Sequence, residues 1–227
     1  MATISPKNII VDFLRKNLTD PRSRAEDSNT EEFDGGGTEF SLTPPSGKVS
    51  AITSVTVDGA DQVKWKDYYI DFQNEKVIFF SATAGGTDNV DISYKHGTSN
   101  WIYPDKPLTT LSKTSFPRLN ILIIDGTGAR VGQYNSDVQT IISFQIDVWA
   151  TEDYVSTIDS IKYEGDKLAE YIGLKVIEVF RSSVDELHPA LYNYNPGHLQ
   201  DLPFNEELQV HHKIFQMEMN TINVGEI

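Results

Sequence analysis

Residues 143–150 read Ser-Phe-Gln-Ile-Asp-Val-Trp-Ala, and their alternation decides the fold class of the chain. Apolar residues occupy every second position, namely Phe144, Ile146 and Val148. Because successive side chains of a strand point to opposite faces of a sheet, this pattern predicts a strand with one buried face. The opposite face then carries Gln145, Asp147 and Trp149. The alternation begins at Val138, so we expect the strand to be long.

The segments around this strand predict a mixed α and β fold. Residues 119–124 are typical of an apolar strand in a sheet interior, and residues 125–128, Asp-Gly-Thr-Gly, predict a hairpin turn. Apolar residues recur at helical spacing from Ile158 to Phe180, which predicts one long helix lying across the sheet.

The C-terminal quarter predicts an irregular stretch and a closing strand. Prolines and a glycine interrupt residues 188–197, so we expect no regular element there. Residues 208–219 predict a last strand, with a bulge near Ile214-Phe215 where the apolar phase switches.

The N-terminus predicts a helix with one apolar stripe. Ser5 followed by Pro6 is a helix start, and apolar residues then recur at three- and four-residue spacing up to Leu18. Pro21 ends the helix, because the residue before a proline avoids the helical region. We therefore expect residues 1–20 to pack as a helix on something larger.

The next segments predict a linker and a separate β unit. Residues 21–37 contain two apolar residues and finish in three glycines, so we expect a flexible linker. Residues 38–104 show short alternating segments between turn signals such as Asp58-Gly59, which predicts a small all-β domain, a sandwich or a barrel. Residues 105–227 then return to the α and β pattern.

Composition narrows the function classes. The 227 residues carry 19 basic and 33 acidic side chains, a net charge of −14. This balance argues against a nucleic-acid binder held by phosphate contacts. The absence of cysteine excludes disulfides, thiolate metal sites and a cysteine nucleophile. We expect neither a membrane span nor a secretory signal, because no apolar run is long or unbroken enough.

The motifs with possible chemistry favour structural interpretations. Gly126 and Gly128 follow a strand as in a phosphate loop, but a second strand follows them where such a loop needs a helix. His211 and His212 are adjacent, so in a strand they lie on opposite faces and cannot share a metal. We expect no catalytic residue, no metal and no cofactor, and therefore no enzyme.

The order of these elements resembles that of the tail terminator, or tail completion, proteins of tailed viruses. The N-terminal helix ends Leu18-Thr19-Asp20-Pro21, and the run Phe116-Pro117-Arg118-Leu119-Asn120-Ile121 resumes the pattern before the strand at 143–150, one long helix and a closing strand. The resemblance covers residues 1–20 and about 115–227. It implies an α+β fold in which an antiparallel sheet packs with both helices, and it makes the unit at 38–104 an insertion.

The resemblance also implies a role and partners. Such proteins form a ring, commonly a hexamer, on the last disc of the tail tube in the neck of the virion. The implied partners are further copies of the chain, the tail tube protein, the sheath protein, the head–tail connector protein, and duplex DNA that passes through the lumen without specific binding. A neck adaptor between head and tail is the closest alternative, because the insertion departs from the terminator pattern.

We expect the interface at Gln145, Asp147 and Trp149, since an exposed tryptophan among polar neighbours is typical of a binding hot spot. The alternative is that Trp149 packs under a second layer of its own subunit. Two further alternatives belong to other classes of protein. A carbohydrate-binding module would use Trp65, Tyr68, Tyr69 or Trp101 as stacking rings, and a hydrolase would need paired carboxylates in a cleft.

Overall fold

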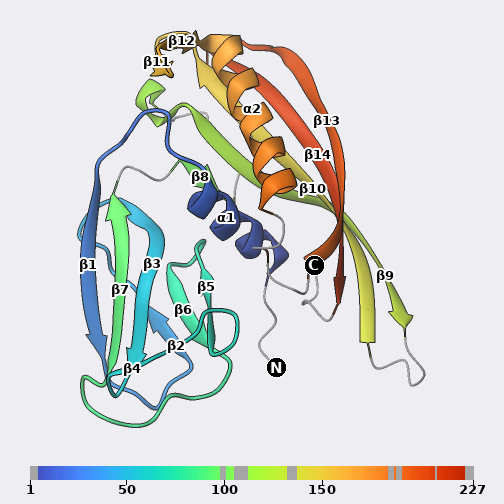
Figure 1. Cartoon of the computed structure of the whole chain (residues 1–227). Coiled ribbons are helices and arrows are strands. Elements are labelled where there is room, and N and C mark those ends of the chain that lie inside the picture. The colour runs from blue at the N-terminus through green and yellow to red at the C-terminus, as the bar shows by residue number, and fades with distance from the viewer. Residues whose placement is uncertain are drawn as a thin grey trace.

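The computed structural model describes residues 5–97, 101–104, 112–131, 137–183, 187, 191–207 and 209–222. The chain forms a β-sandwich and an α/β part, with α1 lying between them (Figure 1). The helices are α1 (Pro6–Asn17) and α2 (Gly165–Ser182), with a 3-10 turn at Lys113–Ser115. The strands of the sandwich are β1 (Glu26–Phe33), β2 (Glu39–Ser41), β3 (Lys48–Val57), β4 (Ala60–Asp61), β5 (Tyr68–Asp71), β6 (Lys76–Phe79) and β7 (Val90–Gly97). The strands of the α/β part are β8 (Ile102–Tyr103), β9 (Arg118–Val131), β10 (Asp137–Thr151), β11 (Val155–Ile158), β12 (Ile161–Glu164), β13 (Leu191–Asn205) and β14 (Val210–Ile222).

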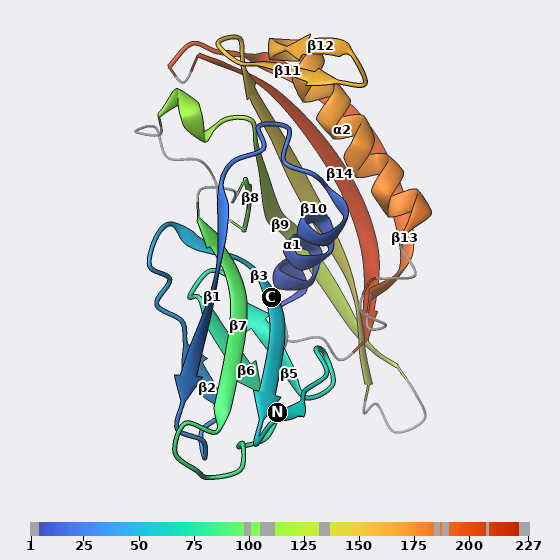
Figure 2. The ribbon, with the colours of Figure 1, turned by 60° about the vertical axis from the view of Figure 1, so that its left-hand side comes forward.

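The α/β part is built on a five-stranded sheet in the order β13-β14-β10-β9-β8. All pairs are antiparallel except β8 with β9. As predicted, β10 is long and buries its apolar face, where Phe144, Ile146 and Val148 are fully buried. Helix α2 lies across this face, and α1 contacts it there through Phe13 and Phe180, whose ring centroids are 5.1 Å apart (Figure 2). The predicted α+β class is confirmed: the sheets are mostly antiparallel and two helices accompany them.

Helix α1 forms where the sequence predicts it. Pro6 occupies the first turn after Ser5, although the Ser5 hydroxyl makes no capping hydrogen bond. Its apolar stripe, including Ile10 and Leu14, is completely buried. The helix ends when Leu18 becomes extended.

Helix α2 begins later than predicted. Residues 155–158 and 161–164 are not helical but form the hairpin β11–β12. Asp159 and Ser160 adopt positive φ angles, which are the backbone geometry of a tight hairpin turn. Ile158 and Ile161 are therefore spaced as in a helix but lie in a hairpin.

The predicted turn at 125–128 is wrong. Strand β9 continues to Val131, and Asp125 and Gly126 pair with Ser143 and Ile142 of β10. The register shifts between Ser143 and Phe144, which leaves Ile124 as the extra residue of a β-bulge. The glycines thus lie in a bent strand that ends at Val131, and β10 begins at Asp137; residues 132–136 lie outside the described residues.

The C-terminal strands also differ from the prediction. Residues 191–205 form β13 rather than an irregular stretch, and its pairing with β14 shifts register three times. No bulge falls at Ile214-Phe215, because β14 pairs with β10 in unbroken register from Ile222 to Val210. The irregularity that the prolines indicated is therefore carried by β13, where a Cβ on Gly197 would lie 1.7 Å from the carbonyl oxygen of Gln216.

The sandwich joins a four-stranded sheet, β1-β7-β3-β4, to a three-stranded sheet, β2-β6-β5. Rings from different sheets pack in its core, for example Phe33 of β1 and Phe40 of β2 with centroids 5.5 Å apart. The predicted turn at Asp58-Gly59 is confirmed, with both residues at positive φ between β3 and β4.

The prediction of a linker over residues 21–37 is wrong for residues 26–33, which form β1. This strand pairs with β7 along its whole length, from Glu26 opposite Gly97 to Phe33 opposite Val90. Its side chains add bonds of their own, because Glu31 accepts hydrogen bonds from Thr43 and from the hydroxyl of Tyr94. An edge strand needs only one apolar face and one ladder, so a polar composition did not prevent it from forming.

Arg15 of α1 fastens the sandwich to the α/β part. Its guanidinium donates to the carbonyl of Ile102 at 2.6 Å and to those of Val49 and Ser50 in β3 at 3.2 and 3.3 Å. The same group lies 4.3 Å from the ring centroid of Phe72. One side chain therefore ties three segments that are far apart in the sequence.

Candidate functional site

One face of the five-stranded sheet is not covered by α1 or α2, and we call it the open sheet face. It is formed by side chains of β9, β10, β14 and β13 that point away from the helices: Asn120, Leu122, Ile124, Ile141, Ser143, Gln145, Asp147, Trp149, Gln200, Leu202, His212, Ile214, Gln216 and Glu218. All three residues predicted at an interface lie on it. The alternation of β10 placed them there correctly.

A hydrogen-bonded network occupies the centre of this face. The Gln145 side-chain amide donates to Asp147 at 2.7 Å, and that of Gln216 donates to Gln145 at 3.3 Å. Nε2 of His212 lies 3.0 Å from the same oxygen of Asp147. The Asp147 carboxylate is buried, with a side chain 2% exposed, so these bonds replace the water it has lost.

Trp149 is a buried residue. It packs within its own subunit, which is the alternative to an exposed interface position. Its side chain is 8% exposed and forms a small core with Phe116 and Val210. Its ring stacks on His212 with centroids 3.6 Å apart and planes at 11°. Of the three residues predicted at an interface, only Gln145 is therefore partly accessible in the single chain, where it lies beside Gln216.

Two buried donors on neighbouring strands lack acceptors in the part of the chain that the structure describes. They are Nδ2 of Asn120 and Nε1 of Trp149. The other end of the Asn120 amide is used, because its oxygen accepts a bond from Arg118 at 3.2 Å. A buried unpaired donor costs about 1–3 kcal/mol, so this corner of the face lowers the stability of the fold.

The helix-covered face carries an ion-pair cluster at the same end of the sheet. Lys213 is buried and binds Asp201 of β13 and Asp166 of α2, the latter at 2.9 Å. Burial lowers the pKa of Lys213, but its bonds to the two carboxylates outweigh burial and leave the pKa above the usual value. The group thus stays charged and ties α2 to two strands.

The two adjacent histidines lie on opposite faces, as predicted. His211 points to the helix side, where Nε2 is 3.0 Å from Glu152, and His212 lies in the open sheet face with Asp147. Among the residues whose placement is described, no group of three or more histidines and acids could hold a metal ion. His188 lies outside that part of the chain.

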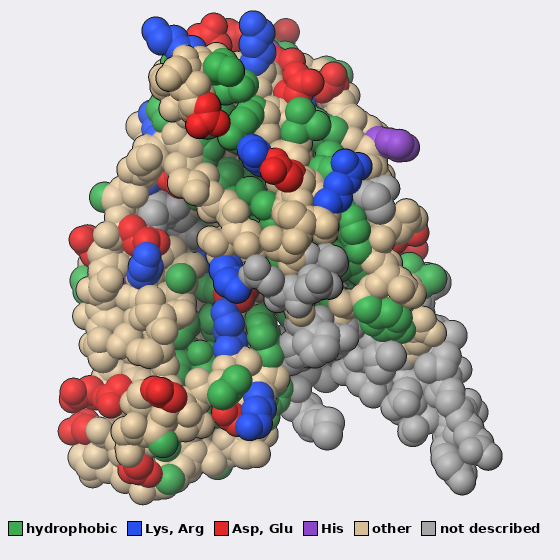
Figure 3. All heavy atoms as spheres, viewed as in Figure 1, with side chains coloured by type: hydrophobic (Ala, Val, Ile, Leu, Met, Phe, Trp, Pro, Cys, Tyr) green, Lys and Arg blue, Asp and Glu red, His purple; other side chains and the backbone are tan. Residues whose placement is uncertain are grey.

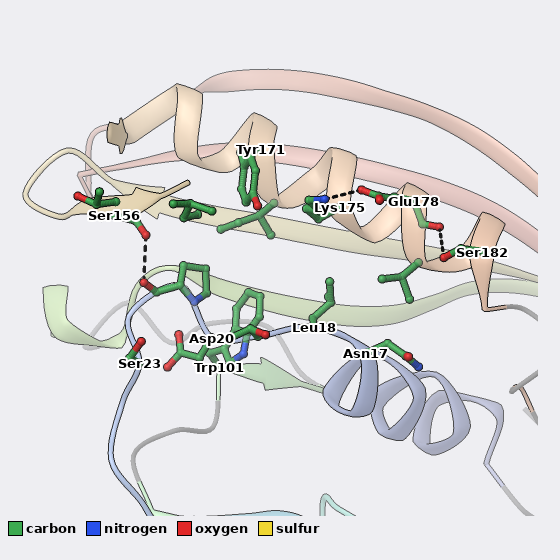
Figure 4. A pocket seen from close by; sticks show the side chains of 16 residues that line it. Asn17, Leu18, Asp20, Ser23, Trp101, Ser156, Tyr171, Lys175, Glu178 and Ser182 are labelled. Carbon is green, nitrogen blue, oxygen red and sulfur yellow. Dashed lines mark hydrogen bonds and ion pairs between the residues drawn. The ribbon is translucent and has the colours of Figure 1, made fainter. Parts of the chain in front are cut away.

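Two grooves of about 520 and 510 Å³ flank the segment that follows α1. The first runs between that segment and α2, and its wall on α2 includes Tyr171, Lys175 and Glu178 (Figure 4). Ser156 closes one end by donating to the carbonyl of Pro21 at 3.0 Å. The exposed Lys175 and Glu178 already bind each other, so the groove presents a neutral wall rather than a charged site.

The aromatic residues proposed for sugar stacking are mostly part of the core. Tyr68, Tyr69 and Trp101 are 5–7% exposed, and Trp65 is half-buried. Stacking on a sugar needs exposed ring faces, which these three do not present.

Sequence reasoning missed His212 and Asn120 as members of the open sheet face, and Phe116 as a neighbour of Trp149. His212 was assigned only a side of its strand, and its pairing with Asp147 depends on the register of β10 with β14. Phe116 precedes β9 and contacts Trp149 from 33 positions earlier in the chain. Only the alternation around Asn120 could have indicated its face.

No protein-family model matches the chain, and no curated protein is similar to it in sequence. Within the described ranges, no helix is both long enough and apolar enough to cross a membrane.

Proposed function

We propose that the chain is a structural virion protein, a ring-forming subunit that caps a tail tube, ends its polymerisation and offers a surface to the head connector. The observation that carries the proposal is the order of elements. A buried N-terminal helix is followed by two long antiparallel strands, a helix across their face and closing strands, with a β-sandwich inserted after the first helix. This order is the one on which the resemblance rests.

Charge supports a role next to DNA without binding it. The sandwich residues 26–97 carry 5 basic and 13 acidic side chains, a net charge of 5 − 13 = −8. On the face drawn in Figure 3, acidic side chains gather over the end of the sandwich farthest from the helices. Like charge removes the counterion release that drives binding to a duplex, so DNA would pass such a ring freely.

The proposed partners are other copies of the chain in a hexamer, the tail tube protein, a sheath protein and the connector. The site is proposed to be structural, with no catalytic residue and no cofactor, and the place of action is the neck of the virion. A neck adaptor is the second candidate, because the inserted sandwich adds a surface that ring closure does not need.

Negative-stain microscopy of the purified chain over a concentration series, with light scattering on the same samples, tests the proposal. Closed rings with an open centre are expected, and adding tail tubes should place one ring at a tube end. Binding to connector alone, without tubes, would favour the adaptor. Monomers at every concentration that bind neither tail tubes nor connector would refute both.

A further inference from the structure

The outer edge of β9 is an unusual feature of the five-stranded sheet. The short strand β8 pairs only with Leu119 and Asn120, so no strand in the described part of the chain pairs with the outer side of β9 beyond them. A strand edge of this kind is a template for another strand, and proteins usually blunt it with charge, proline or irregularity.

Over residues 119–124 the β9 edge carries neither charge nor proline, and its irregularity is the single bulge at Ile124. The sequence there is Leu-Asn-Ile-Leu-Ile-Ile, with no charge and no proline. Ile124 is 51% exposed at the bulge, and the neighbouring Leu122 is partly exposed on the same face. In a chain of net charge −14, two copies repel least where such an uncharged segment meets its equal.

The other described edges are poor partners for it. Strand β1 carries four carboxylates, which oppose the addition of another strand. Strand β13 contains Pro196 and Pro203, and its pairing with β14 shifts register three times. The edge strands β2, β4, β5, β11 and β12 are two to four residues long. The edge best matched to β9 is therefore the β9 of another copy.

We infer that β9 is a self-association edge: two copies join through antiparallel pairing of β9 with β9 about a two-fold axis, which merges two five-stranded sheets into one. Such a contact is isologous, so the same backbone groups are satisfied on both sides. It also covers Leu122 and Ile124 of each copy. This dimer is a property of the free chain and does not rest on the proposed ring.

A pair of lysine variants of the full chain tests the edge, with mass measured by light scattering after size exclusion. At concentrations too low for rings to close, the wild type should give dimers. Ile124→Lys should give monomers, because a charge on the edge opposes strand addition. Ile141→Lys, on the same face but one strand further in and 45% exposed, should still dimerise.

Distances between copies give a second readout, and the cysteine-free chain allows a single spin label at a chosen position. In the paired dimer the two β9 backbones are ~5 Å apart, whereas the two β13 strands lie about seven strand spacings apart, roughly 34 Å. A label at Leu122→Cys should therefore report a much shorter distance than one at Leu202→Cys.

Three results would overturn the inference: a wild-type chain that stays monomeric, loss of association in both lysine variants, or equal label distances. Loss in both variants would assign association to the open sheet face. Rings that persist in Ile124→Lys would refute self-association through the β9 edge and leave the proposed function intact. Edge dimers that never close into rings would support the β9 edge and refute the proposed ring.

Discussion

The sandwich and the five-stranded sheet differ in which of their faces and edges are covered or charged. The sandwich buries the inner faces of both its sheets against each other and places four carboxylates on its edge strand β1. The five-stranded sheet buries one face under two helices, leaves the other to a polar network, and leaves the β9 edge uncharged. The difference teaches that the sandwich buries both its inner faces within one chain, whereas the sheet keeps one face uncovered by helices and one edge unpaired in the described residues.

The largest loss of stability is expected from Trp149→Ala, which changes the five-stranded sheet and not the sandwich. Removing this buried ring should lower the free energy of unfolding by about 3–5 kcal/mol, through the cavity left beside Phe116 and Val210 and the lost stack on His212. Urea denaturation followed by tryptophan fluorescence measures it, with Trp149→Phe as the milder control. A fully stable variant that fails only in assembly would restore the interface prediction for Trp149.

A smaller effect should follow from Arg15→Met, which separates the two regions. The change removes charged donors from the carbonyls of Ile102 and Val49, so we expect a loss of about 2–4 kcal/mol. Limited proteolysis should cut between the regions sooner. The exposed Lys167→Met on α2 is the matched control and should alter stability by less than ~0.5 kcal/mol. Unchanged proteolysis in Arg15→Met would show that α1 holds the regions together by packing alone.

Alkaline pH should destabilise the sandwich through two tyrosines. Burial raises the pKa of Tyr68 to about 12, and burial with a hydrogen bond to Glu31 raises the pKa of Tyr94 to about 12. Well below pH 10 both residues are neutral in the folded and in the unfolded state, so stability is unaffected there. Between about 10 and 12 the unfolded chain loses these protons first, and stability falls as pH rises, by at most ~1.4 kcal/mol per pH unit for each tyrosine.

Thermal unfolding across this pH range, with tyrosinate absorbance on the same samples, measures that loss. Tyr68→Phe should reduce the slope by about half. An unchanged slope in this variant would assign the alkaline loss to other groups, such as Lys213.

The smallest effect is expected from Asn120→Leu in the corner of the open sheet face. The change removes an unpaired buried donor but also an acceptor for Arg118, so the net change should stay within ~1 kcal/mol. If stability is unchanged while association of the chain weakens, the amide serves a partner rather than the fold. A loss of more than ~3 kcal/mol in the free energy of unfolding would show that the Asn120 side chain is required for the fold.

Sequence reasoning found the parts of the fold in which side-chain pattern and burial agree. The alternation at 144–148 and the helical spacing from Leu168 to Phe180 both correspond to fully buried stripes. Reasoning failed at β1 and β13, because an edge strand is held by its backbone ladder and needs little apolar content. It also failed at Gly126 and Gly128, where the pairing of β9 with β10 outweighs the local preference for a turn.

For the candidate site, the sequence predicted which side of the sheet the residues occupy, but not how deeply each one is buried. Gln145, Asp147 and Trp149 share one side of the sheet, as alternation requires. That Trp149 is buried depends on Phe116 and Val210, which lie 33 and 61 positions away, and no local pattern encodes such contacts.

The pairing of Glu26 with Gly97 has a consequence for how the molecule could change over evolution. These residues open and close the sandwich, and they face each other on adjacent strands. The host chain thus leaves and re-enters at a single point, so the sandwich behaves as a cassette with its two ends side by side. A longer, shorter or unrelated module with ends equally close could be exchanged for it while β9, β10 and α2 keep their places.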